Sequence, residues 1–455
     1  MSGLIGSLTM ASQSLDAQRY GLEVTGQNIA NLNTDGYVRR TVDLEEVASG
    51  SGGGVRVSGV RAERDRLLDL RVRRELPARE QQAAVADSLG VVEASLGEAG
   101  TSIDGRLTAF FDAFSKLSDD PTSSVARDGT VLQGQLLARG FRDMSARLDD
   151  SARAADAQIR AGVDRINSLA AQIAALNVSI ADANGGDVET LKDRQNTALA
   201  TLAGLADVVT LERPEGGVDV SIGTGRALVV GGQQYTVGAA ASGASGFAAI
   251  TIGGADITQE VTRGQMGGWL QVRDTLLPGY ENRLDQIAFA VVQQVNALHQ
   301  AGFDMSATSG HSFFTPLSDA GGAARAIAVD PAIAADPTMV AASRTGASGD
   351  NQTAKAIVAL RDGRTMSGGT ATLTDMWSQL VYRVGSDAST ASAQRQSRQQ
   401  IVDQIARLRD QVSGVSLDEE AATMLKFQRA YEANARFFRA VDEALTTLMN
   451  MVGAG

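Results

Sequence analysis

The sequence predicts a mainly α-helical, elongated, multi-domain rod with paired terminal coiled-coil helices, an α-helical bundle domain and a small inserted β domain. Three observations lead to this fold class. Apolar residues recur at a fixed interval near both chain ends, a long helical period fills the first half of the chain, and a glycine-rich segment with alternating apolar residues lies in the middle. At 455 residues the chain is long enough for several domains, each with its own hydrophobic core.

The N-terminal segment repeats apolar residues every seven positions. Such a period keeps one seam of a helix facing a partner helix, as in coiled coils. We therefore expect these residues to form terminal-helix and subunit contacts. They are Leu4, Leu8, Ala11, Leu15, Leu22 and Ile29.

The C-terminal segment carries a second seven-residue repeat, formed by Met424, Tyr431, Phe438, Leu445 and Val452. Gly414 breaks the segment before it, and Ser416 and Glu419 have the spacing of a capping box. A single such helix could pack onto its own domain, but two at opposite chain ends are most simply buried against each other. We therefore expect residues 1–40 and 413–455 to form one helical domain.

One segment in the first half of the chain has an unbroken helical period. It predicts a helix from Val125 to about Ala183, roughly 90 Å long at the rise of an α-helix. The same period returns at 282–299 and 398–412. We expect residues 41–207 and 269–412 to form an elongated helical domain, with some irregular segments such as 302–350.

The middle of the chain has the pattern of short strands. Residues 216–268 contain 14 glycines and no proline, and Val218, Val220 and Ile222 alternate with polar residues. Gly231 and Gly232 separate two apolar runs, as in a two-residue hairpin. We expect residues 208–268 to form an inserted, β-rich outer domain.

The composition argues against catalytic and metal-binding sites and against nucleic acid and membranes as partners. A formal charge of −12 disfavours nucleic acid and anionic membranes as partners, and no apolar stretch has the length of a membrane span. There is no cysteine, and the two histidines, His299 and His311, lack metal-ligand spacing. We therefore expect no catalytic, cofactor-binding or metal-binding residues and no enzymatic activity. The N-terminus also lacks the pattern of a cleavable secretory signal.

The stretch NIANLNTDGYVRR, residues 28–40, follows the first helical repeat directly. We expect the helix to end between Asn31 and Gly36, because Gly36 can adopt positive φ. The stretch resembles the signature of the axial proteins of the bacterial flagellum, the rod, hook and hook-associated group, although it departs from it at Leu32 and Asp35. The motif positions are Asn28, Asn31, Thr34, Gly36, Tyr37 and Arg39.

The C-terminal stretch SGVSLDEEAATMLKFQRAYEANARFFRAVDEALTTLMNM, residues 413–451, resembles the junction members of the same group. Residues 263–304 and 348–360 agree with them as well. The resemblance covers most of the chain except the glycine-rich insert.

This resemblance implies a structural subunit of the flagellum that forms the junction between hook and filament and is required for filament assembly and motility. It implies a homo-oligomer in a helical ring, with the hook protein below and a second junction protein and the filament above. It also implies export by the flagellar type III export apparatus, an export chaperone on the C-terminal helix, and an extracellular location after a transient cytoplasmic stage.

Two alternatives remain open at this point. One is another axial protein, such as the hook subunit or a distal rod subunit. The other is a wall-cleaving enzyme or an adhesin with axial-type termini, for which paired carboxylates in the central segment would be needed. The acids between residues 216 and 268 are Asp219, Asp256 and Glu260, which are scattered along the sequence.

Overall fold

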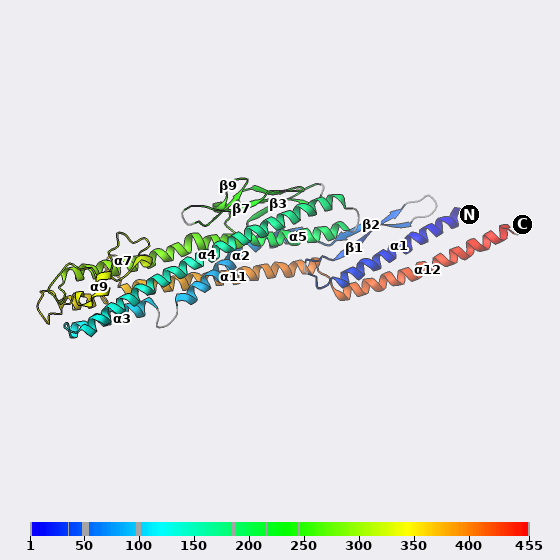
Figure 1. Cartoon of the computed structure of the whole chain (residues 1–455). Coiled ribbons are helices and arrows are strands. Elements are labelled where there is room, and N and C mark those ends of the chain that lie inside the picture. The colour runs from blue at the N-terminus through cyan, green and yellow to red at the C-terminus, as the bar shows by residue number, and fades with distance from the viewer. Residues whose placement is uncertain are drawn as a thin grey trace.

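The computed structural model describes residues 2–34, 36–47, 54–96, 102–183, 187–214, 216–243 and 246–453. The molecule is elongated, with both termini at one end and a helical rod extending to the other (Figure 1). Strands of the inserted segment lie along one side of the rod (Figure 1). The predicted fold class, mainly α with a small β insert, is confirmed.

The terminal helices lie side by side and run antiparallel (Figure 1). The first, α1, spans Ser2–Ala30, and the last, α12, spans Leu417–Gly453. The C-terminal end of α1 and the N-terminal end of α12 therefore lie together at the near end of the rod.

A β-hairpin follows α1. Its strands β1, Arg40–Val47, and β2, Gly54–Ala62, pair antiparallel with a register shift after Asp43. Both strands pack against α1. These residues were predicted to lie in the helical domain; the alternation of Val55 and Val57 with arginine is the local signal for a strand.

Long helices build the rod. Helix α4 spans Ser124–Asp182, 59 residues, and confirms the long helix predicted from about Val125 to Ala183. It begins at Ser123, whose side chain accepts a hydrogen bond from the Ala126 amide. The other main helices are α2 (Arg66–Leu96), α3 (Ile103–Asp119), α5 (Asp187–Leu205), α6 (Gly264–Gln271), α7 (Leu277–Ala301) and α11 (Leu373–Ser413).

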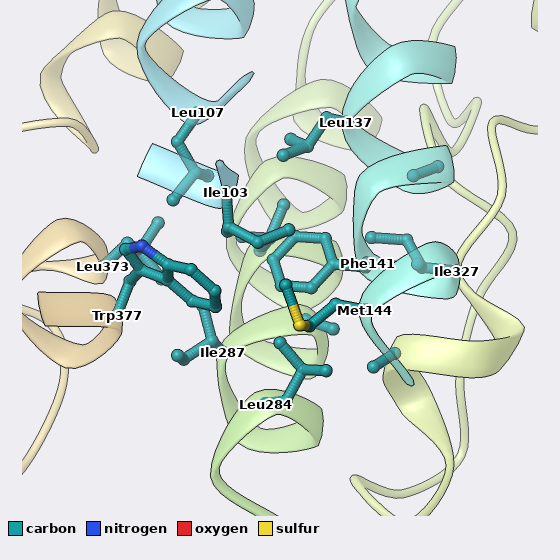
Figure 2. Close-up of a cluster of buried hydrophobic side chains, with 14 of the residues drawn as sticks. Ile103, Leu107, Leu137, Phe141, Met144, Leu284, Ile287, Ile327, Leu373 and Trp377 are labelled. Carbon is teal, nitrogen blue, oxygen red and sulfur yellow. The ribbon is translucent and has the colours of Figure 1, made fainter. Parts of the chain in front are cut away.

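The far end of the rod holds a dense apolar core, part of which is drawn in Figure 2. There α3, α4, α7 and α11 converge, and Phe141 and Trp377 are buried between them. The segment predicted to be irregular, 302–350, contains only short helical turns: α8 (Ala323–Ala326), α9 (Pro331–Ala335) and the 3-10 turn η3 (Pro337–Met339). Helix α10 (Gln352–Ala359) follows.

The inserted segment forms two small antiparallel sheets. The strands are β3 (Val208–Glu212), β4 (Val218–Ile222), β5 (Arg226–Val230) and β6 (Gln233–Gln234) in one sheet, and β7 (Val237–Ala241), β8 (Ala248–Ile252) and β9 (Ala255–Asp256) in the other. The predicted hairpin at Gly231 and Gly232 is confirmed, because Val230 pairs with Gln233 and Gly231 has a φ of 57°. The 3-10 turn η1, Thr258–Glu260, then leads to α6, so the last residues of the predicted 208–268 insert are helical. The domain boundaries stay a prediction.

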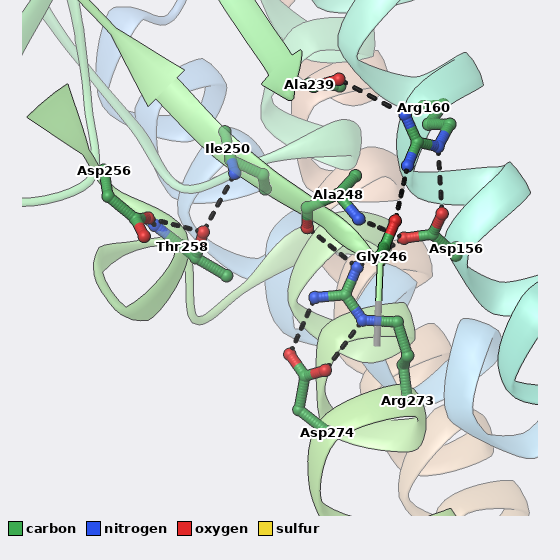
Figure 3. A network of polar contacts seen from close by, with 10 residues as sticks. All are labelled: Asp156, Arg160, Ala239, Gly246, Ala248, Ile250, Asp256, Thr258, Arg273 and Asp274. Carbon is green, nitrogen blue, oxygen red and sulfur yellow. Dashed lines mark hydrogen bonds and ion pairs between the residues drawn. The ribbon is translucent and has the colours of Figure 1, made fainter. Parts of the chain in front are cut away.

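A buried ion-pair network attaches the insert to the rod (Figure 3). Asp156 of α4 accepts hydrogen bonds from the Ala248 amide and from Arg273, each at 2.7 Å. Arg273 lies in the π-helical segment η2, Val272–Leu276, and also donates to the Ala248 carbonyl. The hydrogen bonds to Asp156 outweigh the desolvation of its carboxylate by burial, so the pKa of that group is lowered.

Candidate functional site

The motif at residues 28–40 forms the elbow between α1 and the hairpin. Helix α1 ends at Ala30, and the chain turns through hydrogen bonds from the Thr34 amide to the Asn31 carbonyl (2.9 Å) and from the Tyr37 amide to the Thr34 carbonyl (3.1 Å). The Thr34 hydroxyl donates to Asn31 Oδ1 at 3.2 Å. Asp35 lies outside the described residues. The helix therefore ends where the sequence predicted.

Gly36 is required at the elbow for two independent reasons. Its φ is +79°, in the left-handed region that side-chain-bearing residues disfavour. A Cβ atom at this position would also lie 2.7 Å from Oγ1 of Thr197 on α5. The elbow thus runs directly over the surface of α5, with no room for a side chain.

Asn28 is the polar centre of the elbow. Its side chain is buried, and Oδ1 accepts from the Tyr37 hydroxyl (2.8 Å) and from the Arg40 amide (3.0 Å). Its Nδ2 donates to the Arg40 carbonyl and to Glu420 Oε2, each at 2.9 Å. All four hydrogen-bonding positions of the amide are therefore used. Burial raises the pKa of Tyr37, and the charge of Arg40 opposes this effect only in part. The phenol therefore stays protonated and can donate its hydrogen bond.

Arg39 connects the elbow to α12. Its Nε donates to Glu420 Oε1 and its Nη1 to Glu419 Oε2, both at 2.8 Å. Its backbone amide donates to the Ser413 carbonyl at 3.0 Å. Glu420 is buried, whereas the Glu419 side chain is 63% exposed. The motif is thus completed by residues nearly 400 positions further along the chain, and Glu420 was not among the predicted site residues, although it lies in the same acidic stretch as Glu419.

A second set of ion pairs connects the elbow to the rod. Arg40 Nη2 donates to Asp193 Oδ2 of α5 at 2.8 Å, and Arg64 binds the other oxygen of the same carboxylate. The Arg40 guanidinium also lies 4.9 Å from the centre of the Tyr37 ring. Nothing in the sequence links Asp193 to the motif, because no local period or spacing relates the two.

The predicted seam of α1 faces inward to different degrees. Ala11 is buried, and the other five residues are partly buried: Leu4, Leu8, Leu15, Leu22 and Ile29. On α12, Met424, Phe438 and Leu445 are partly buried, whereas Tyr431 is 38% exposed. The side chain of Val452 lies outside the described residues. The role of these residues in subunit contacts stays a prediction.

The structure adds a second row to the α12 seam. Glu420, Phe427, Asn434 and Val441 recur every seven residues and are buried or partly buried. Together with the predicted row they give the alternating spacing of four and three that defines a heptad seam. Gly21 of α1 lies against Phe427, since a Cβ atom on Gly21 would be 2.5 Å from the ring. This row was not predicted from the sequence, because two of its members, Glu420 and Asn434, are polar.

The predicted cap of α12 has a different arrangement. Ser416 directly precedes the helix, but Glu419 directs its carboxylate to Arg39. Gly414 has an ordinary φ of −75°, and its importance comes from close packing: a Cβ atom there would lie 2.3 Å from the Asp410 carbonyl oxygen. Glycine is therefore favoured at the break before α12 because a side chain would clash with the preceding turn, and not because the backbone needs a positive φ.

A cavity of about 620 Å³ lies beside the elbow, between Tyr37, α4 and α5. Within the described ranges, histidine and the acidic residues form no group of three that could hold a metal ion. Of the helices in the part of the chain that the structure describes, none combines the length and apolar character needed to cross a membrane.

Two family models match the chain. Residues 89–314 match the helical domain of flagellar hook-associated protein FlgK, and residues 410–451 match the C-terminal region of flagellar basal body rod proteins FlgEFG. Together the two ranges cover more than half of the chain. The paired terminal helices, the elbow motif and these matches define the class: the chain is an axial protein of the bacterial flagellum.

Full-length relatives narrow the class. Flagellar hook-associated protein 1 of Bacillus subtilis is 27% identical and that of Escherichia coli 22% identical, with 99% or more of this chain and all of each relative aligned. The solved flagellar hook junction protein FlgK of Burkholderia pseudomallei shares the fold, with a TM-score of 0.66 at 17% identity over 75% of this chain and all of that one. The chain belongs to the flagellar hook-associated protein 1 family.

Proposed function

We propose that the chain is a structural subunit of the junction between the flagellar hook and the filament, required for filament assembly, and that it is not an enzyme. The observation that carries this proposal is the antiparallel pair of α1 and α12, which is joined to a self-contained rod through the elbow. In such a helix pair the seam holds the two helices together, and the exposed apolar surface is available to pack against other copies of the chain.

The alternative of another axial protein has less support. The match to the rod-protein model spans residues 410–451 and concerns the C-terminal helix that axial proteins share. The match over 89–314 is specific to the hook-associated helical domain, and it includes the long helix α4. The match over 89–314 therefore favours a junction subunit over a hook or distal rod subunit.

The alternative of a wall-cleaving enzyme or adhesin finds no support in the carboxylates of the insert. Asp219 accepts hydrogen bonds from the Gly231 amide and from Arg213, and Asp256 accepts hydrogen bonds from the amide and hydroxyl of Thr258, two residues further along the chain. Glu260 pairs with Arg226. Each carboxylate serves a turn or strand contact of the insert itself.

The remaining partners follow from the same proposal. Copies of the chain would form a helical ring, with the hook protein below and the second junction protein and filament above. The flagellar type III export apparatus would secrete the chain, and an export chaperone would cover α12 before export. The exposed apolar residues of α12, such as Leu425 and Phe437, are what such a chaperone would shield.

Two experiments test this proposal. Replacing Leu22 with Asp puts a charge into the α1 seam, so we expect no incorporation into flagella while the urea unfolding of the rod stays unchanged. Ser12→Asp, on the exposed face of the same helix, is the control for added charge. Normal incorporation of the Leu22 variant would contradict the proposal. Deleting the gene should leave intact hooks and release flagellin into the medium; filaments of normal length would argue for a different role.

A further inference from the structure

The seven-residue apolar repeats of α1 and α12 do not by themselves define the register of the helix pair. Leu8, Leu15 and Leu22 recur every seven residues on α1, and Met424 and Phe438 belong to a row with the same interval on α12. Sliding α12 by seven residues would therefore place apolar side chains against apolar side chains again. A heptad pair with this property needs some other feature to select one alignment.

Two contacts agree on a single alignment. Asn28 Nδ2 donates to Glu420 Oε2 at 2.9 Å, and the ring of Phe427 fills the space left by Gly21. Gly21 is seven residues before Asn28, and Phe427 is seven residues after Glu420. In an antiparallel pair these offsets cancel, so the polar contact and the steric contact specify the same register.

Glu420 is the buried charge of this seam. In the described parts of α1 and α12, the buried polar side chains are Thr25, Asn28 and Glu420. Thr25 donates to the Gly21 carbonyl of its own helix and so contributes nothing to alignment. If α12 moved seven residues toward the chain ends, Glu420 would face Gly21 and lose both of its partners. A buried carboxylate without partners is strongly disfavoured.

We propose that Glu420, held by Asn28 and Arg39, is the residue that specifies the register of the terminal helix pair. The contact acts by penalising every alignment in which the carboxylate loses its partners, as single polar residues do in other heptad seams. The exposed Glu419, which binds the same arginine, has no such role, because water can solvate it in any alignment. The proposal concerns the fold of the chain itself and holds whatever its place in the flagellum.

The chain contains no cysteine, so two introduced cysteines form the only thiol pair. Ala17 and Tyr431 each lie four residues beyond the Gly21–Phe427 contact and are therefore level across the seam. Ala17→Cys with Tyr431→Cys reports the proposed alignment. Ala17→Cys with Met424→Cys or with Phe438→Cys reports a slide of seven residues, about 10 Å along the helix axis. That distance exceeds the reach of a disulfide, so each pair is specific for one register.

Each pair is oxidised in the full-length chain with and without Glu420→Leu. A leucine keeps the seam apolar and the helices associated, but it leaves Arg39 and Asn28 without their partner in the original register. In the parent chain we expect the level pair to dominate. We compare the yield of the displaced disulfides, Ala17→Cys with Met424→Cys or Phe438→Cys, with that of the level disulfide, Ala17→Cys with Tyr431→Cys. Glu420→Leu should raise this ratio by about tenfold or more, the size of effect expected from one buried charge. Glu419→Leu, the matched control, should leave the ratio unchanged.

Four results would overturn the proposal: no level disulfide in the parent chain, only the level disulfide with Glu420→Leu, no disulfide in any register with Glu420→Leu, or an equal shift with Glu419→Leu. Far-ultraviolet circular dichroism and urea unfolding confirm in each case that the rod, which does not contain Glu420, keeps its fold.

Discussion

The two ends of this molecule bury their apolar side chains in opposite ways. At the far end of the rod, Phe110, Phe141 and Phe313 are fully buried among four helices and the loops that cover them. At the other end, α12 leaves Phe437 at 42% and Met449 at 66% exposure. The rod completes its own core, whereas the terminal pair leaves large apolar side chains exposed.

Side-chain size explains the difference. The buried positions of α1 include Ala11, Ala17 and Gly21, so two helices approach closely but enclose little volume. The rod core instead packs phenylalanine rings edge to face, with Phe313 and Phe314 centred 4.9 Å apart. A pair of helices has only one shared face, and a helix in the rod has several.

The largest expected effect is in the rod core. Phe110 contacts four other phenylalanine rings, so Phe110→Ala leaves a large cavity and should lower the free energy of unfolding by about 3–5 kcal/mol. Urea unfolding followed by circular dichroism measures the change. Tyr382→Ala, at a side chain that is 77% exposed, should stay within about 0.5 kcal/mol. Equal losses for the two variants would remove the distinction between the core and its surface.

The second effect depends on pH and also lies in the rod. His299 is fully buried, its Nδ1 is 2.7 Å from the His311 carbonyl oxygen, and its Nε2 accepts from the Ala341 amide at 2.9 Å. The ring is therefore neutral, with its proton on Nδ1. Burial lowers the pKa of His299 to about 4, against a smaller opposing effect of the hydrogen bond to His311. Arg127 also disfavours the charged ring, and Asp304 favours it.

The folded-state pKa lies below the unfolded value of about 6.5, so the unfolded chain takes up the proton first. The stability that comes from His299 is fully present above pH 6.5 and is lost as the pH falls toward 4, up to about 3 kcal/mol. His299→Gln can make the same two hydrogen bonds without titrating. Unfolding midpoints of the parent chain and this variant at pH 7 and pH 4.5 should diverge at the lower pH; parallel losses would contradict the assignment.

The smallest effect on stability is expected in the terminal pair. Phe437→Ser removes an exposed apolar side chain, so the free energy of unfolding of the isolated chain should change by less than about 0.5 kcal/mol. Incorporation into flagella should nevertheless decrease, because neighbouring subunits would cover this surface. Quantitative immunoblots of purified flagella measure incorporation. A variant that is destabilised as strongly as Phe110→Ala would show that the terminal pair is as self-contained as the rod.

Period and turn chemistry were enough to predict most of the fold. The seven-residue repeats located α1 and α12, the continuous apolar period located α4 almost to the residue, and Gly231 marked its hairpin. The β1–β2 hairpin was missed because charged residues interrupt the apolar pattern of its strands, and a two-stranded ribbon against one helix has only a weak alternation of burial.

The elbow was located from the sequence, but its partners were not. The motif marks Asn28, Gly36 and Arg39, because the end of a helix and a positive φ have local signatures. Glu420 and Asp193 reach these residues only through the tertiary fold. The heptad spacing that runs back from Met424 places position 420 in the seam and position 419 outside it, but a row that contains Glu420 and Asn434 has no apolar period by which to recognise it.

The elbow also has a mechanical consequence. The chain passes between the terminal helices and the rod twice, between β2 and α2 and near Gly414. The Arg39 backbone bridges the two passages, because its amide donates to the Ser413 carbonyl and its carbonyl accepts from the Glu63 amide. A torque that twists one module against the other therefore loads both of these neighbouring segments, together with the ion pairs from Arg40 and Arg64 to Asp193. Because they are cross-connected by a hydrogen bond and by the Arg39–Glu420 ion pair, they share the load in shear instead of separating one after the other.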